Sequence, residues 1–108
     1  MKHIAYAETV VATDDHVADL VLEYAKLLAR ANTADTVTIP GRVGEGGTEA
    51  VSLLIGPASQ ITTWADAEPF GDDVSGAVDE LEQRIHRLAG GIPTSAEPPF
   101  GADLDDLD

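Results

Sequence analysis

Two stretches of this 108-residue chain have apolar residues spaced three and four apart, which is the pattern of an amphipathic helix. The first stretch follows Thr13-Asp14-Asp15, where a side-chain oxygen can cap a helix and acids favour its positive end. It runs to Asn32, and its apolar side consists of Val17, Leu20, Val21, Tyr24, Leu27, Leu28 and Ala31. We expect a helix here, with Leu20 and Leu27 facing a sheet.

The second stretch predicts a helix that begins after Asp72-Asp73 and ends at Gly90-Gly91, shortly before Pro93. Its apolar seam consists of Val74, Val78, Leu81, Ile85 and Leu88. A helix with one apolar stripe must bury that stripe against another element, so both helices require a second layer.

Four further segments have the composition of β-strands. Residues 3–12 are rich in β-branched residues without helical spacing, and residues 36–39 and 49–55 alternate polar with apolar side chains. Residues 60–65 are β-prone and follow the strand-ending pair Gly56-Pro57. We expect the glycine-rich segment 41–47 to be a hairpin loop, because glycine readily adopts the positive φ of such loops.

Together these segments predict an α+β two-layer sandwich in the order β-α-β-β-β-α. A right-handed crossover through the first helix would make strands 3–12 and 36–39 parallel, which gives a mixed sheet with both helices on one face. Strand 60–65 is expected to fold back beside strand 49–55. The domain should comprise residues 1–91, and residues 92–108, with three prolines and no basic residue, are expected to form a flexible, disordered acidic tail.

The charge of the chain is strongly negative. Twenty acids and six bases give a net charge of -14, and the tail holds five of the acids, which leaves -9 for residues 1–91. Such a field repels phosphate, so we expect no direct nucleic-acid binding and no anionic membrane surface as a partner. No apolar run is long enough for a membrane span or a signal segment, which predicts a cytoplasmic protein.

The motifs that carry chemistry are weak in this sequence. The absence of cysteine excludes disulfides, thiolate nucleophiles and cysteine-based metal sites. Glycines 41–47 lack the Lys-Ser/Thr of a phosphate-binding loop, and Ser59 lacks the second glycine of a nucleophile elbow. His3, His16 and His86 form no closely spaced pair, and no acidic run has the pattern of a calcium loop. We therefore predict no catalytic, cofactor-binding or metal-binding residues.

Two features favour binding of another protein. The seam of the second helix resembles a coiled-coil stripe that would suit a homodimer, although packing within the domain is the commoner use of such a seam. In the tail, Phe100, Leu104 and Leu107 stand at i, i+4 and i+7 beside Asp105 and Asp106. An apolar stripe flanked by acids is the pattern of a helix that docks into a groove of a partner.

These observations predict a non-enzymatic adaptor that uses its acidic surface and its tail to bind a protein partner, which we expect to be basic. One alternative is a small-molecule-binding domain or minor enzyme with a pocket near the 64–70 loop. A second alternative is a structural homo-oligomer.

Overall fold

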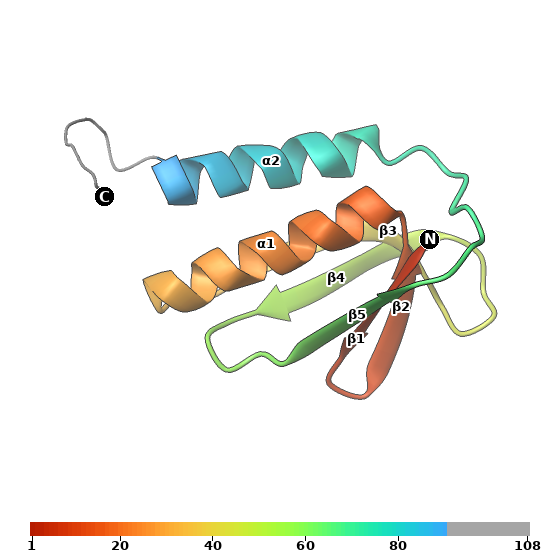
Figure 1. Ribbon diagram of the computed structural model, residues 1–108, viewed down its shortest axis with the longest axis horizontal. Helices are drawn as coiled ribbons and strands as arrows, with labels where there is room; N and C mark the ends of the chain where they lie inside the picture. The colour runs from red at the N-terminus through yellow and green to blue at the C-terminus, as the bar shows by residue number, and fades with distance from the viewer. Residues whose placement is uncertain (91–108) are drawn as a thin grey trace.

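A computed structural model describes residues 1–90 of the protein, and residues 91–108 lie outside the described part. A five-stranded sheet forms one layer and two helices form the other, so the predicted α+β class is confirmed (Figure 1). The elements are β1 (Lys2–Tyr6), β2 (Thr9–Thr13), α1 (Asp15–Ala31), β3 (Asp35–Val43), β4 (Glu49–Ile55), β5 (Ile61–Ala65) and α2 (Ser75–Gly90).

The helix ends follow the capping signals in the sequence. The Asp14 carboxylate accepts the backbone N–H groups of His16 and Val17 at the start of α1, and Asn32 ends that helix in the left-handed conformation. The Asp73 carboxylate accepts the N–H of Ser75 at the start of α2. In the described residues neither helix is long and apolar enough to cross a membrane.

The first predicted strand is wrong in one respect, because it is a hairpin rather than a single strand. β1 and β2 pair antiparallel, and Ala7 and Glu8 form the turn between Tyr6 and Thr9. Ala7 has a φ of 56°, a conformation that usually requires glycine at this position of a two-residue turn. The sequence contains no Gly, Asn or Pro here, so nothing in it indicates the reversal.

The hairpin changes how the first part of the chain pairs with the rest of the sheet. The sheet order is β4-β3-β2-β1-β5 and all four pairings are antiparallel, so the mixed sheet that we predicted is wrong. β5 pairs with β1 rather than with β4, which also corrects the predicted place of strand 60–65. One side of β1 pairs with β2, and β5 pairs with its other side.

The sheet curls, but it does not close into a barrel. β2 and β3 share only the pairs Val11 with Val43 and Ala12 with Arg42, so the two halves of the sheet diverge from this point. Gly41 lies at the crossing, where an added Cβ would stand 2.6 Å from the Val11 side chain. A five-residue connection, 56–60, joins β4 and β5, although these strands form opposite edges of the sheet.

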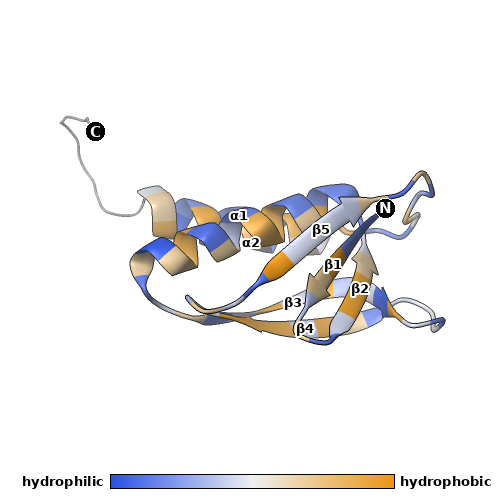
Figure 2. Ribbon diagram, turned by 60° about the horizontal axis from the view of Figure 1, so that its bottom comes forward, coloured by the Kyte–Doolittle hydropathy of each residue, from blue (hydrophilic) through white to orange (hydrophobic). Residues whose placement is uncertain are grey.

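The core lies between the sheet and the helices (Figure 2). Its residues on α1 are Val17, Ala18, Val21, Tyr24 and Leu28, which pack against Ile4, Val11, Val37, Ile39, Leu53 and Ile55 of the sheet. Leu20 and Leu27, which we expected to face the sheet, are only partly buried. α1 is therefore rotated, and Val21 and Leu28 take the central positions.

α2 is attached to this core by its apolar seam and by one polar cluster. Leu81 is buried and the other seam residues are half-buried against the core, so the seam packs within the domain. The Arg84 guanidinium donates to the Thr36 carbonyl oxygen at 2.7 Å and to Asp35 at 3.0 Å. The Tyr24 hydroxyl also donates to Asp35, and this hydrogen bond, with help from Arg84, lowers the pKa of the Asp35 carboxyl.

Candidate functional site

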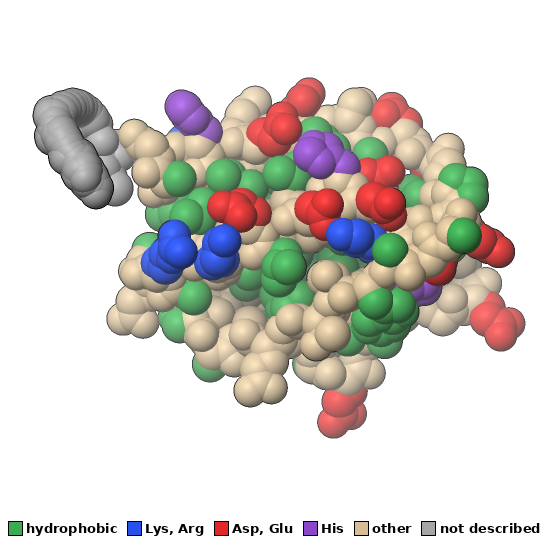
Figure 3. All heavy atoms as spheres, viewed as in Figure 1, with side chains coloured by type: hydrophobic (Ala, Val, Ile, Leu, Met, Phe, Trp, Pro, Cys, Tyr) green, Lys and Arg blue, Asp and Glu red, His purple; other side chains and the backbone are tan. Residues whose placement is uncertain are grey.

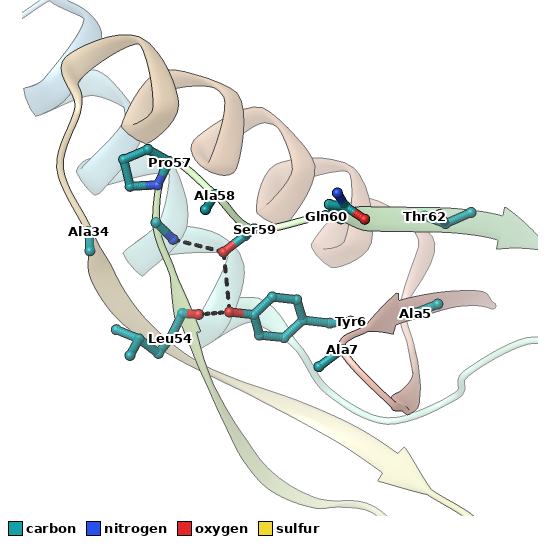
Figure 4. Close-up of a pocket in the computed structure, with 11 residues that line it drawn as sticks. Ala5, Tyr6, Ala7, Ala34, Leu54, Pro57, Ala58, Ser59, Gln60 and Thr62 are labelled. Atoms are coloured by element: carbon teal, nitrogen blue, oxygen red, sulfur yellow. Dashed lines mark hydrogen bonds between the residues drawn. The ribbon is translucent and has the colours of Figure 1, made fainter.

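A groove of about 770 Å³ opens where the two halves of the curled sheet diverge (Figure 4). It lies between the β1–β2 turn, the end of β4 and the 56–60 connection. None of its lining residues is charged, in a chain of which 24% is charged. They are Ala5, Tyr6, Ala7, Ala34, Leu54, Gly56, Pro57, Ala58, Ser59, Gln60 and Thr62.

The polar groups in the groove hold the fold together. The Tyr6 hydroxyl donates to the Leu54 carbonyl oxygen and so bridges β1 to β4 across the open side of the sheet. The Ser59 hydroxyl oxygen accepts the Gly56 N–H at 2.9 Å and lies 3.2 Å from the Tyr6 hydroxyl. Ser59 is thus the turn residue that the sequence suggested, and no histidine or carboxylate lines the groove to act as its base.

The groove belongs to a larger surface, the sheet face that the helices leave uncovered. Residues paired across strands point to the same face, so this surface follows from the register. Ile4 and Val11 face the helices, and their neighbours along each strand face outward. We define the outer sheet face as His3, Ala5, Val10, Ala12, Thr36, Thr38, Pro40, Arg42, Ala50, Ser52, Leu54, Thr62 and Trp64.

No carboxylate belongs to the outer sheet face, and its two basic side chains are already bound at its border. His3 stacks on Trp64 and lies 2.6 Å from Asp66, a hydrogen bond that lowers the pKa of the Asp66 carboxyl. Arg42 lies over the Phe70 ring, donates to the Phe70 carbonyl oxygen and pairs with Asp72.

The helix layer has the opposite character. Acidic side chains cluster over the helices in Figure 3, and Asp15, Asp19, Glu23, Glu80 and Glu82 are all about half exposed or more. Four of the six Lys and Arg residues are paired with carboxylates: Lys2, Lys26, Arg42 and Arg84. The helices also carry four of the six bases, so six acids and four bases give them a net charge of -2, and most of the domain's excess carboxylates lie on the strands and loops.

A second groove of about 460 Å³ runs between α1 and the end of α2. Leu20 and Ile85, both partly buried, supply its apolar floor, and Glu23 and Glu82 supply carboxylates at its rim. Glu82 lies 3.6 Å from the His16 ring. His86, Ala89 and Gly90 complete the lining, and Lys26 lies 3.6 Å from Glu23. We call this surface the helix groove; it combines an apolar floor with exposed carboxylates at the rim.

The predicted site residues are distributed as follows. Phe100, Leu104, Asp105, Asp106 and Leu107 lie outside the described residues. The segment 41–47, predicted to be a hairpin loop, forms that loop only from residue 44 onward, because β3 continues through residue 43 and Gly41 pairs with Glu49. Among residues 1–90, no three His, Asp or Glu side chains come close enough to hold a metal ion. The 64–70 loop, where the alternative prediction put a pocket, has its Phe70 ring buried against Arg42.

Comparisons of the chain with protein-family models, with curated proteins and with solved structures found no match. The argument for function therefore depends on the two surfaces described above.

Sequence reasoning missed both grooves. The outer groove depends on the hairpin at residues 7–8, which has no turn signal, and on the divergence of β2 from β3. The alternation in β3 and β4 does identify Thr36, Thr38, Ser52 and Leu54 as outward positions, and it was the only signal for this face.

Proposed function

We propose that this protein is a non-enzymatic, cytoplasmic adaptor that binds a basic protein partner, and that the helix groove is the docking site on the domain. The observation that carries the proposal is the pairing of an apolar floor, Leu20 and Ile85, with rim carboxylates at Glu23 and Glu82. A basic amphipathic helix presents the complementary surface, since its apolar stripe fits the floor and its cations meet the rim.

The surrounding charge supports the same partner. Asp15 and Asp19 extend the negative surface along α1 from Glu23, and the net charge of the domain is negative. Such a field speeds the encounter with a basic partner and repels nucleic acid and anionic membranes. The chain's own acidic tail is a poor occupant of the helix groove because it carries the same sign of charge.

The tail supplies a second contact in this proposal. Gly90 lines the helix groove, and Phe100 follows it by ten positions of the chain, so the motif can lie at most about 35 Å away. A partner held at the groove would then meet Phe100, Leu104 and Leu107 as a tethered second ligand at a raised effective concentration.

The test uses the full chain and a synthetic peptide with Lys and Leu at helical spacing. The double variant Glu23→Gln/Glu82→Gln should bind the peptide about tenfold more weakly, because two exposed ion pairs of about 0.5–1 kcal/mol each are lost. Binding by the native chain should also weaken as salt rises. Isothermal titration calorimetry at several salt concentrations measures both effects.

A matched control separates the groove from net charge. Glu45→Gln/Glu49→Gln removes the same charge from the exposed end of the β3–β4 hairpin and should leave the affinity within about twofold. Equal loss of affinity in the two double variants would show that the peptide senses only the total charge, and the helix groove would then be rejected as the site.

A further inference from the structure

We propose that two copies of this chain associate through the outer sheet face, with the uncharged groove at the centre of the contact. This inference is independent of the function proposed above, since it uses the opposite layer of the sandwich. The occupant is a second copy of the chain.

Charge selects this face for self-association. In a two-fold interface the same patch of each copy faces its counterpart, so any carboxylate in the patch meets a carboxylate of the other copy. Two domains that each carry a net charge of -9 repel one another, and the repulsion is smallest where the facing patches hold no carboxylate. The outer sheet face contains no carboxylate, His3 is hydrogen-bonded to Asp66 at its border, and Arg42 pairs there with Asp72.

The face also combines projecting side chains with a hollow. Val10 lies beside Ala5 on the neighbouring strand, Ala5 lines the groove, and Trp64 lies two residues from Thr62 of the groove wall. Val10, Leu54 and Trp64 are among the large apolar side chains that remain exposed. An interface of one face with itself needs both features, because each copy must offer a projection and receive one.

The size of the surface fits a stable contact. The outer sheet face and the groove lining together comprise about 20 residues, the number that each partner contributes to an interface of standard size.

Other occupants fit less well. A basic partner finds no carboxylate in the groove, and the acidic tail finds no cation there. A small polar ligand would have to displace hydrogen bonds that Tyr6 and Ser59 already make within the fold.

Sedimentation equilibrium of the full chain over a range of concentrations tests the proposal. We expect a monomer–dimer equilibrium that strengthens when salt rises from about 0.02 M to about 0.5 M, because salt screens the repulsion between two acidic chains. Trp64 is the only tryptophan, so its emission should shift to shorter wavelength as the dimer forms. The opposite salt dependence separates this contact from docking of a basic partner.

Val10→Glu and Leu54→Glu should each raise the dimer dissociation constant at least about tenfold, since each places a carboxylate opposite its symmetry mate. Leu22→Glu is the control: it makes the same change on α1, where Leu22 is 42% exposed compared with 44% for Val10. It should leave the dimer unchanged, and circular dichroism should show all three variants folded.

Three results would overturn the proposal. The first is a native chain that stays monomeric up to millimolar concentration, and the second is a dimer that survives both Val10→Glu and Leu54→Glu. The third is a monomer that carries a bound small molecule in native mass spectrometry, which would assign the groove to a ligand instead.

Discussion

The helix layer and the outer sheet face are both exposed to solvent, but they differ in how many charged side chains they present. The helix layer has a dense set of carboxylates around a small apolar floor. The outer sheet face has threonine, serine, alanine and a few large apolar side chains, and its two bases are bound at the border. An exposed surface with few charges and several large apolar side chains is typical of an interaction site, so the outer sheet face is the better candidate for a contact with another copy.

The same contrast between a covered and an uncovered face is found within β4. Leu53 and Leu54 are neighbours on β4, with exposed fractions of 6% and 62%, because alternate side chains of a strand point to opposite faces. Leu53 therefore contributes to the core of the monomer, whereas the Leu54 side chain is accessible at the surface.

The largest predicted effect is on stability and comes from truncating the buried leucine of β4. Leu53→Ala should lower the free energy of unfolding by about 2–5 kcal/mol, through lost burial and the cavity left behind, whereas Leu54→Ala should cost under about 0.5 kcal/mol in the monomer. Urea unfolding at a protein concentration too low for dimer formation measures both changes in the free energy of unfolding. A larger cost for Leu54→Ala than for Leu53→Ala would mean that β4 faces the helices with its other side.

The polar cluster that attaches α2 should give the next effect. Asp35→Asn removes a charged acceptor from Tyr24 and Arg84 and should cost about 1 kcal/mol at neutral pH. The pKa of Asp35 is lowered in the folded protein, so the native carboxylate stabilises fully above its unfolded value of about 4, and this contribution is lost as the pH falls below it.

Unfolding curves of both proteins between about pH 7 and pH 2 check this, and the gap between them should narrow in acid. A gap that stayed constant over this range would show that the asparagine acts through packing and not through charge.

A smaller effect is expected at the turn beside the uncharged groove. Ala7→Gly should stabilise the domain by about 0.5–1 kcal/mol, because glycine adopts the positive φ of this residue without strain. Ala5→Gly, in the strand just before it, is the matched control and should destabilise by about 1 kcal/mol. Thermal unfolding of the two variants distinguishes them, and a loss of stability in Ala7→Gly would contradict the assigned turn.

The smallest effect concerns the tail. Truncation after Gly91 is expected to leave the Tm nearly unchanged. Calorimetry measures the Tm, and a drop of more than a few degrees would show that the tail packs on the domain.

Leu104→Ser/Leu107→Ser in the full chain should weaken partner binding without changing the charge. A binding titration with the identified partner measures this effect, and unchanged binding would reject the motif.

Local signals in the sequence determined the helices, their caps, the glycine hairpin and the alternation of β4. Each depends on residues within a few positions of one another, such as Asp14 with His16 and Val17, or Asp73 with Ser75.

Only the tertiary structure decided the reversal at Ala7, the pairing of β5 with β1 and the position of the outer groove. The Tyr6 hydroxyl reaches the Leu54 carbonyl oxygen across 48 positions of sequence, and Arg84 joins Asp35 across 49. Such contacts form when the core packs, and packing also holds Ala7 in a conformation that its own preference disfavours. The uncharged groove is lined by residues from β1, β4, β5 and the 56–60 connection, so its position depends on how these elements pack and not on any one segment of sequence.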